Sequence, residues 1–232
     1  MIAQGDVVSH TRMCAEEGEN LQRGMNYSIR AGVSVILMSL GPNAPYADRI
    51  EQNGKILIYE GHDVAKRQGG PDPKTVDQPE HNPSGTLTQN GLFRKAAESN
   101  KRDYKEAELV RVYEKIRKGV WVYNGLFRLV DAWQEHSGGR KVFKFKLELI
   151  DELIVRVDPG NINDIDHTRV IPTPVKLEVW KRDKGKCVKC GSTNNLHFDH
   201  IIPYTKGGSS RDAANIQLLC ARHNLAKSDK IE

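Results

Sequence analysis

The sequence predicts an α+β protein. A curled antiparallel sheet or barrel with flanking helices is expected first, and a small metal-stapled domain is expected at the C-terminal end. Residues 109–149 alternate apolar and polar side chains with the period of two that strands show. Residues 91–100 carry apolar side chains at helical spacing. Residues 187–223 contain two short pairs of Cys and His, a spacing typical of structural zinc sites.

The N-terminal part contains two short candidate strands before a long polar segment. Val33 to Ser39 is an apolar, β-prone run and is expected to be a buried strand. Lys55 to Tyr59 is a second expected strand, and Asn53-Gly54 before it favours a hairpin turn. Residues 61–90 are poor in apolar side chains, so we expect a long loop of the kind that is usually functional or disordered.

The alternating region predicts the main strands of the sheet. They are expected at Leu109 to Tyr113, Gly119 to Tyr123, Leu126 to Val130 and Phe143 to Leu149. The chain is expected to turn at Asn124-Gly125 and at Gly138-Gly139. On the last strand the odd-numbered side chains are apolar, and the even-numbered ones, from Lys144 on, are charged. This sorting predicts a sheet with one face in water.

A change of composition marks a domain boundary. Residues 151–175 lose the alternation and are rich in turn residues, so we expect a first domain at 1–155, a linker at 156–174 and a second domain at 175–232. From residue 176 onward eleven Lys and Arg stand against six Asp and Glu, which accounts for the whole net charge of +5. A basic domain beside a neutral one fits a polyanionic partner bound mainly at one end.

The overall composition is that of an ordinary globular protein, with 38% hydrophobic and 28% charged residues. No apolar run approaches the roughly 20 residues of a membrane span, so no membrane partner is expected. The polar start is unlike a signal peptide, and we expect a cytoplasmic location. Three of the four cysteines belong to the metal spacing, and Cys14 is expected to be a buried reduced thiol.

The metal spacing predicts a zinc site. Cys187 and Cys190 form one pair, and Cys220 and His223 form the second after 29 intervening residues. Together they supply the four sulfur and nitrogen ligands of a tetrahedral structural Zn²⁺ site. A domain of this size needs such a staple because its core is small. Two alternatives stay open: the pairs carry no metal, or His223 is not the fourth ligand.

A second pattern, interleaved with the first, predicts hydrolysis of a phosphodiester. His200 can act as a general base because imidazole titrates near neutral pH. Asp199 offers a hard oxygen to a divalent ion, Mg²⁺ or Mn²⁺, and the zinc pairs can fold Asn224 back towards it. Asn215 can fix the orientation of the His200 ring. Lys227 could contact a flanking phosphate.

These residues lie in three stretches, Val179 to Gly191, Leu196 to Gly208 and Asn215 to Lys227, which resemble the zinc-stapled HNH endonuclease domain of the McrA-like kind. The resemblance covers roughly residues 175–230 and implies a ββα-metal fold. It implies that the His of the Asp-His pair is the base, that the preceding Asp and the late Asn hold the catalytic ion, and that the middle Asn positions the His. His223 departs from the family, which usually has a fourth Cys there.

A second resemblance lies in the first domain. It rests on V-I-L-M-S from Val35, Y-A-D from Tyr46, N-G-K-I-L-I-Y-E-G from Asn53, T-Q-N from Thr88, W-V-Y-N-G-L-F-R-L-V-D-A-W from Trp121 and F-K-F-K-L from Phe143. These stretches resemble the SRA (YDG) domain. The resemblance implies a curled β-barrel of the PUA type that binds duplex DNA and flips a 5-methylcytosine into a pocket. Two family triplets are altered here, to Y-N-G at Tyr123 and Y-E-G at Tyr59.

A pocket for a flipped base needs particular side chains. Aromatic faces replace the lost base stacking, and Tyr46 and Tyr59 could sandwich the base. A carboxylate such as Asp48 suits the N4 amine of cytosine. The backbone around Glu60 and Gly61 can reach the other edge of the base. These residues are the candidate modified-base pocket.

The long polar loop and the helix after it are the candidate DNA-binding elements. The loop ends at Asn90 and could enter the duplex, filling the gap that a flipped base leaves. Arg94 and Lys95 follow on the expected helix and are candidates for phosphate contacts.

The two resemblances together imply a prokaryotic, modification-dependent restriction endonuclease that acts on double-stranded DNA with a modified cytosine. A homodimer would supply the two sites that double-strand cleavage needs. Two alternatives stay open: an HNH nuclease acting on unmodified DNA, and a reader that binds modified DNA without cutting it.

Overall fold

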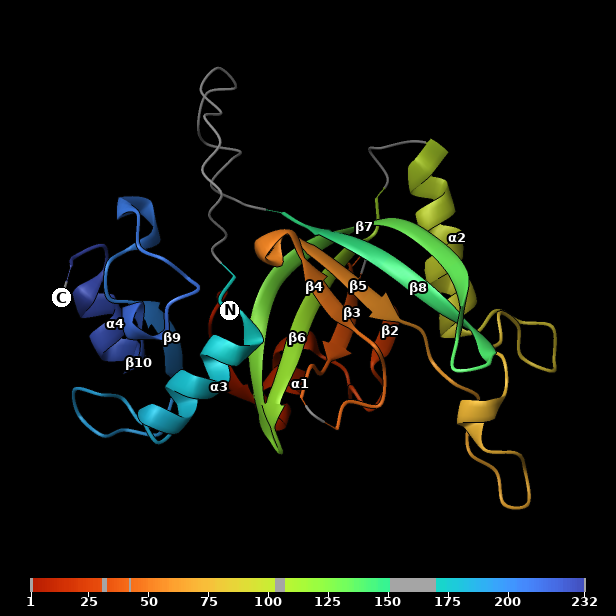
Figure 1. Ribbon diagram of the computed structural model, residues 1–232, viewed down its shortest axis with the longest axis horizontal. Coiled ribbons are helices and arrows are strands. Elements are labelled where there is room, and N and C mark those ends of the chain that lie inside the picture. The colour runs from red at the N-terminus through yellow and green to blue at the C-terminus, as the bar shows by residue number, and fades with distance from the viewer. Residues whose placement is uncertain (1, 31–32, 42, 103–106, 151–169, 232) are drawn as a thin grey trace.

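The computed structural model of the protein describes residues 2–30, 33–41, 43–102, 107–150 and 170–231. It confirms the α+β class. A large curled sheet with two helices occupies most of the chain, and a small ββα unit lies beside it at the C-terminal end (Figure 1). None of the described helices has the length and apolar character needed to cross a membrane.

The large sheet is built from strands that the alternating patterns had largely indicated. They are β1 (Val7–Ser9), β2 (Met25–Arg30), β3 (Val33–Met38), β4 (Arg49–Glu51), β5 (Ile56–Glu60), β6 (Leu109–Arg117), β7 (Val120–Ser137) and β8 (Arg140–Leu149). Their order is β2-β3-β6-β7-β8-β5-β4, and β1 pairs with the start of β7. The expected hairpin before β5 is present, with a 3-10 turn at Gln52–Gly54.

The sheet departs from the expectation in two respects. Its order starts at β2 and ends at β4, and these strands do not pair with each other in the described part of the chain. The sheet is therefore open there, whereas a barrel would be closed. In addition, β3 and β6 are parallel, whereas an antiparallel sheet was expected. A parallel pair needs a long crossover connection, and residues 39–108 supply it.

The expected turn at Asn124-Gly125 is wrong. β7 continues through it from Val120 to Ser137, and Asn124 is the extra residue of a β-bulge in the pairing with β6. Gly125 has φ +117°, which an L side chain rarely adopts, so glycine allows the strand to bend here. An Asn-Gly pair favours a turn, but the same two residue types also suit a β-bulge. The second expected turn, at Gly138-Gly139, is confirmed.

Helices cover the sheet. α2 (Gln89–Arg102) buries Phe93 and Ala97 against Phe143 and Phe145 of β8. α1 (His10–Glu17) packs on the sheet beside Tyr113. The face of β8 that was expected to contact water is buried at Lys144. Burial of this lysine is possible because its ammonium group is paired with Glu60. The expected long loop at 61–90 has a 3-10 turn, Pro73–Thr75, and one isolated bridge up to residue 88, and its last two residues already belong to α2.

The C-terminal unit begins with α3 (Thr173–Arg182). It continues with β9 (Leu196–His200), a 3-10 turn at Tyr204–Lys206, a second at Ala213–Asn215, β10 (Ile216–Cys220) and α4 (Ala221–Lys227). β9 and β10 form an antiparallel pair. Most of the expected linker, residues 156–169, lies outside the described residues, and α3 begins within its last two positions.

Candidate active site

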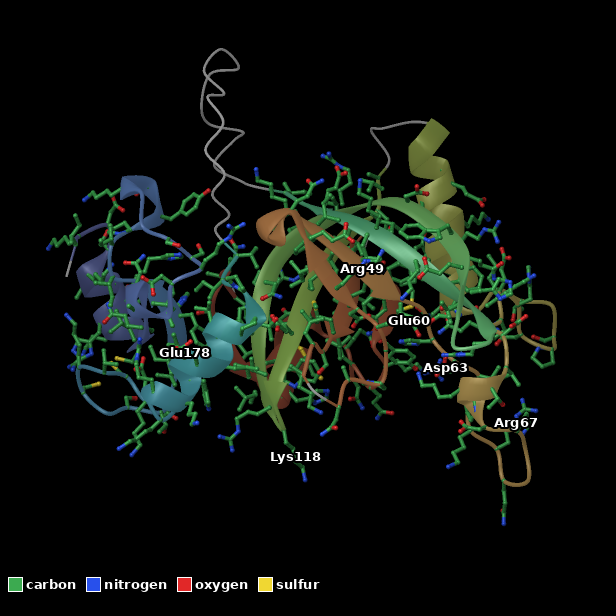
Figure 2. The ribbon with its side chains drawn as sticks, in the orientation of Figure 1. Arg49, Glu60, Asp63, Arg67, Lys118 and Glu178 are labelled. Atoms are coloured by element: carbon green, nitrogen blue, oxygen red, sulfur yellow. The ribbon has the colours of Figure 1, made fainter. Side chains whose placement is uncertain are left out.

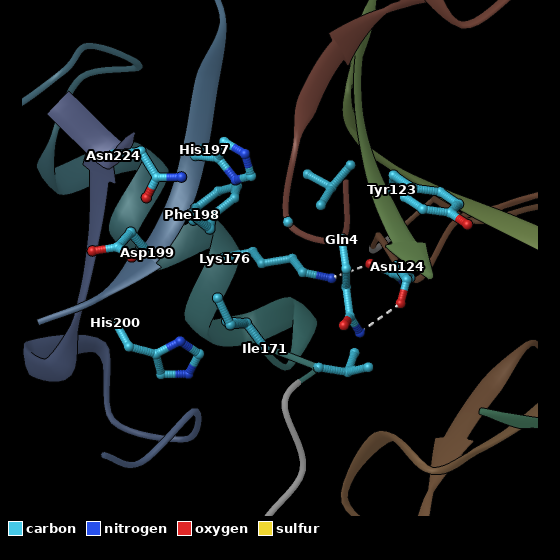
Figure 3. A pocket seen from close by; sticks show the side chains of 13 residues that line it. Gln4, Tyr123, Asn124, Ile171, Lys176, His197, Phe198, Asp199, His200 and Asn224 are labelled. Atoms are coloured by element: carbon cyan, nitrogen blue, oxygen red, sulfur yellow. Dashed lines mark hydrogen bonds between the residues drawn. The ribbon is translucent and has the colours of Figure 1, made fainter. Parts of the chain in front are cut away.

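The residues predicted to cut DNA come from two neighbouring elements of the ββα unit. Asp199 and His200 end β9, and Asn224 lies in the middle of α4. All three line one pocket of about 120 Å³. In Figure 3 they lie on one side of this pocket, and Gln4 and Asn124 of the large domain lie on the other. The pocket therefore lies between the ββα unit and the large domain.

The carboxylate of Asp199 is held by one of its oxygens. Oδ2 accepts from Lys227 Nζ at 3.1 Å and from Gln217 Nε2 at 3.4 Å. Within the described residues, Oδ1 has no hydrogen bond or ion pair, and neither does the side-chain amide of Asn224. A carboxylate oxygen and an amide oxygen without partners, beside one pocket, fit a hard divalent cation. These two residues are thus suited to hold the expected ion.

Lys227 lies elsewhere than the sequence suggested. Its residue is only 2% exposed, and its ammonium group faces the Asp199 carboxylate. A phosphate outside the protein cannot reach a group in this position without rearrangement. The placement therefore differs from the expected DNA contact, because α4 turns this side chain inward. The sequence around Lys227 did not indicate this, since the residue is the last one of α4.

His200 has a direct side-chain partner that the sequence analysis missed. Its Nε2 lies 2.8 Å from Ser210 Oγ, and Ser210 is only 4% exposed. Such a contact sets the ring orientation and the tautomer of a histidine. The only available signal was the glycine pair at 207 and 208, which returns the chain towards β9.

Asn215 does not contact the His200 ring directly, in contrast to the expectation. Its Oδ1 accepts from Ile202 N at 2.8 Å, and its Nδ2 donates to Ile202 O at 3.2 Å and to Ser209 O at 3.0 Å. Asn215 therefore ties together the two ends of the loop that carries Ser210. A Cβ on Gly208 would lie 1.7 Å from Ile202 O, so this close loop requires glycine.

The four predicted zinc ligands converge. The ligand atoms of Cys187, Cys190, Cys220 and His223 all lie within 4.8 Å of one another. Nδ1 of His223 lies 3.3 Å from the Cys187 sulfur and 3.4 Å from the Cys220 sulfur. Burial raises the pKa of the Cys187 thiol, but backbone N–H groups around it and His223 outweigh this and lower the pKa to about 6. Three thiols and one imidazole at this spacing can hold a zinc ion.

His197 faces the large domain. Its Nε2 lies 2.5 Å from Asp6 Oδ1 in the N-terminal segment. Although burial opposes ionisation of Asp6, the hydrogen bond and charge of His197 lower its pKa below the ordinary value. His197 therefore joins the two parts of the protein.

The aromatic residues of the candidate base pocket are arranged differently from the expected sandwich. Tyr59 is only 1% exposed and belongs to the core of the large domain. Tyr46 is half-buried, and its ring stacks on His62 with centroids 5.9 Å apart. Lys74 Nζ lies 4.0 Å from the centre of the Tyr46 ring. The Tyr59 hydroxyl contacts His62 Nε2 at 3.5 Å, so His62 connects the two tyrosines.

Charged groups surround this region. Asp48 Oδ1 accepts from Glu60 N at 2.9 Å, and burial raises the pKa of Asp48 to about 7. Glu60 is buried and accepts from Lys144 Nζ at 2.8 Å, so its side chain is held in place. Asp63 pairs with Arg140 at 2.6 Å. Figure 2 shows Glu60 and Asp63 following one another where β5 ends.

The other predicted DNA-binding residues differ in exposure. Asn90 is buried, and it accepts from His62 N and donates to His62 O and Pro79 O, so it fastens the loop to α2. Arg94 forms ion pairs at 3.0 Å with Glu80 and Glu98. Lys95 is exposed.

Comparison with known proteins agrees with the two units. The family model described as SAD/SRA domain matches residues 7–152, and the one described as HNH endonuclease matches residues 187–230. No curated protein matches the chain.

Solved structures also match. The SUVH5 SRA domain in complex with fully methylated CG DNA is 27% identical, with 64% of this chain and 90% of that chain covered and a TM-score of 0.45. The same domain bound to fully hydroxymethylated CG DNA is 26% identical, with 71% and 94% covered and a TM-score of 0.43. The modification-dependent TagI restriction endonuclease is 22% identical, with 97% and 76% covered and a TM-score of 0.42.

The match of the first family model extends over more than half of the chain, and the second falls on the ββα unit that brings Asp199, His200 and Asn224 to one pocket. The chain therefore belongs to the SAD/SRA domain family and carries an HNH endonuclease domain at its C-terminal end.

Proposed function

We propose that the protein is a modification-dependent DNA endonuclease. In this proposal its SRA domain flips a 5-methylcytosine, or a related modified cytosine, out of duplex DNA, and its HNH domain hydrolyses a phosphodiester bond nearby. The observation that carries the cutting step is the pocket shared by Asp199, His200 and Asn224. A domain that only bound DNA would need neither a general base nor two oxygen atoms placed to bind a metal ion beside it.

The chemistry assigns one role to each side chain. His200, held at Nε2 by Ser210, takes a proton from the attacking water through its other ring nitrogen. Asp199 and Asn224 hold a divalent ion, Mg²⁺ or Mn²⁺, in the pocket. That ion, when bound, would stabilise the charge on the phosphate and the leaving oxygen. Lys227 and Gln217 bind Oδ2 of Asp199 and so hold its carboxylate in one orientation, which leaves Oδ1 for the ion.

Zinc has a separate, structural role in this proposal. Cys187, Cys190, Cys220 and His223 bind one Zn²⁺ ion, which leaves no open position for a substrate. The first pair precedes β9, and the second joins β10 to α4. The zinc ion therefore holds α4, with Asn224 on it, beside the strand that carries Asp199.

The modified base is proposed to bind between the Tyr46 ring and the Asp48 carboxyl group. Tyr46 offers a ring face for stacking, and a base that uses it displaces either His62 or the Lys74 ammonium group. Asp48 accepts a hydrogen bond from the cytosine N4 amine. Tyr59 and Glu60 support this region from the core, and Lys95 is the exposed cation for a phosphate contact.

The test compares methylated and unmethylated copies of one plasmid, each incubated with the protein and Mg²⁺ or Mn²⁺. We expect cleavage of the methylated copy and little cleavage of the other. Equal cleavage of both would overturn the dependence on modification and favour an HNH nuclease for unmodified DNA.

A variant separates cutting from binding. His200→Ala removes the base without touching the SRA domain, so it should bind methylated DNA like the wild type and leave it intact. A wild-type protein that binds methylated DNA but cuts it under neither metal would instead be a reader. Cleavage by His200→Ala at the wild-type rate would contradict the role of the imidazole.

A further inference from the structure

We propose, resting on the function above, that the junction between the SRA and HNH domains fixes the distance between the modified base and the cut. The cutting position is then set by a rigid contact and not by the length of the segment that joins the domains. Three groups of contacts in the described residues carry this inference.

The first contact is the N-terminal segment, which bonds to both sheets. β1 pairs with β7 of the large sheet at Val7, Val8 and Ser9. Just before it, Gly5 and Asp6 exchange backbone hydrogen bonds with Tyr123 of β7. On its other side the same segment bonds to β9, because Phe198 N donates to Gly5 O. Figure 1 shows the N-terminus between the two units. The N-terminal segment thus joins both sheets edge to edge, and the Asp6–His197 ion pair reinforces it.

The second contact is a buried polar cluster. Lys176 of α3 extends its ammonium group to Glu114 of β6 and to Asn124 of β7, each at 2.6 Å. Lys176 is 2% exposed and Glu114 is 0% exposed. Thr173, also on α3, donates to the same carboxylate. Asn124 can reach this cluster because it is the extra residue of the β-bulge, and bulges redirect side chains in this way.

The third contact is apolar. The core of the HNH unit, which includes Val179 and Phe198, is continuous with Val122 of β7. Val7 and Ile116, from the large domain, pack against the same core. A buried charge cluster that needs partners from both domains, together with a shared apolar core, permits few relative orientations.

The difference from a flexible tether is large enough to measure. A flexible chain of about twenty residues spans roughly 25 Å, which is about seven base pairs of DNA at about 3.4 Å per step. A domain held only by such a tether would cut over a range of that order. A domain held by the contacts above would cut at one position or a few adjacent positions.

The experiment uses a duplex with one modified cytosine at a known position, and the product ends are mapped on a sequencing gel. The first variant carries ten extra Gly and Ser residues inserted after residue 160, away from all the junction residues named above. We expect its cut positions to match those of the wild type. A spread of cuts that grows with the insertion would overturn the proposal.

The second variant loosens the junction. Lys176→Ala removes the ammonium group shared by Glu114 and Asn124, and we expect its cuts to spread over several additional positions. Lys181→Ala is the matched control, since it removes an exposed lysine from the same helix. If Lys176→Ala does not fold, the insertion decides alone. A folded Lys176→Ala protein that cuts like the wild type would contradict the role of the cluster.

A readout without cleavage separates this proposal from the proposed function. Small-angle X-ray scattering of the full-length protein should give the same radius of gyration before and after the insertion. A larger radius after the insertion would contradict a rigid junction even if cutting depends on modification as proposed. Equal cutting of modified and unmodified DNA would contradict the proposed function, but it would not affect what the scattering measurement shows about the junction.

Discussion

His200 and Asp199 are each held by a residue outside the Asp-His-Asn-Asn pattern. Ser210 contacts the ring of the first, and Lys227 pairs with the carboxylate of the second. Both partners are buried, so the surrounding fold holds each of them in place. We therefore expect the proposed catalytic roles of these two residues to depend on neighbours that the motif does not include.

Ser210→Ala should slow cutting without weakening DNA binding. The loss of the contact to Nε2 frees the His200 ring, and we expect the rate to fall by roughly 10- to 100-fold, the loss that is typical when a metal-bound histidine loses its outer partner. Single-turnover cleavage and a gel-shift titration check this, and Ser210→Thr should restore most of the rate because it keeps the hydroxyl group. A similar loss in both variants would show that bulk at this position, rather than the hydroxyl, matters.

Lys227→Met tests whether this lysine contacts DNA or supports Asp199. A phosphate contact would contribute about one unit to the slope of log Kd against log salt concentration. We expect the slope to remain unchanged and the melting temperature to fall, since the Asp199 oxygen loses its charged partner. Lys95→Met, at an exposed position, is the control and should reduce the slope. A reduced slope in Lys227→Met would show that Lys227 contacts a DNA phosphate after all.

The elevated pKa of Asp48 predicts that base binding depends on pH. Burial raises this pKa from 3.8 to about 7, so the group is neutral below pH 7 and a carboxylate above it. A carboxylate accepts from the cytosine amine more strongly. Affinity for methylated over unmethylated DNA should therefore rise between pH 6 and 8, and Asp48→Asn should flatten the profile. A profile unchanged by the substitution would rule out Asp48 as the group responsible.

The same shift affects stability with the opposite sign. Between about pH 4 and pH 7 the folded state keeps a proton on Asp48 that the unfolded chain has lost. The free energy of unfolding should therefore decrease as the pH rises through this window. Asp48→Asn should remove that part of the decrease, which chemical denaturation at several pH values would show.

At the scale of elements, the ββα unit and the large sheet are stabilised differently. The sheet has an extended apolar core under α2, whereas the HNH unit has its own core and four converging side chains that could hold a metal ion. α4 has no side-chain cap at its N-terminal end, where Cys220 stands. Its position therefore depends on the ligands at its start.

Removal of zinc should unfold the HNH unit selectively. A chelator strong enough to extract the ion removes the link between β10, α4 and the first Cys pair. Limited proteolysis should then cut within residues 175–232 while the large domain stays resistant. Cys190→Ser should reproduce this susceptibility without a chelator. Protection of the HNH unit in both cases would mean that its core suffices without metal.

At the scale of the whole molecule, the large sheet and the HNH unit are joined by side chains that are buried between them. Glu114 is fully buried in one domain, and its charged partner comes from the other. Burial opposes its ionisation, but the charge of Lys176 and the hydrogen bonds around it lower its pKa below the ordinary value. Removal of Lys176 while the domains stay packed would leave the Glu114 carboxylate buried without its charged partner, which costs about 3–5 kcal/mol.

This coupling predicts cooperative thermal unfolding. The wild-type protein should unfold in one transition, because neither domain can lose the shared groups without cost to the other. Lys176→Ala should separate the process into two transitions, and Lys181→Ala should not. Differential scanning calorimetry distinguishes these outcomes. Two transitions in the wild type would mean that the junction is weaker than the folding of each domain.

Short-range sequence patterns were sufficient to predict much of the secondary structure of this protein. The α+β class, β3, β5, β8, α2 and the convergence of the zinc ligands follow from spacings within a few residues or between two closely spaced pairs. The physical reason is that strand alternation, helical periodicity and ligand spacing are properties of a local stretch of chain. Such stretches form the same element in many tertiary settings.

Only the tertiary structure decided which distant residues meet. Asn124 and Gly125 are typical turn residues, yet they form a bulge, because β6 pairs with β7 along one side and β1 and β8 pair with the other side before and after them. Ser210 meets His200, and Lys176 meets Glu114, through loop closure and domain packing that no local pattern encodes. Side chains in contact across long sequence separations are selected by burial and charge pairing in the folded state, so local sequence determined the elements and their packing determined the site.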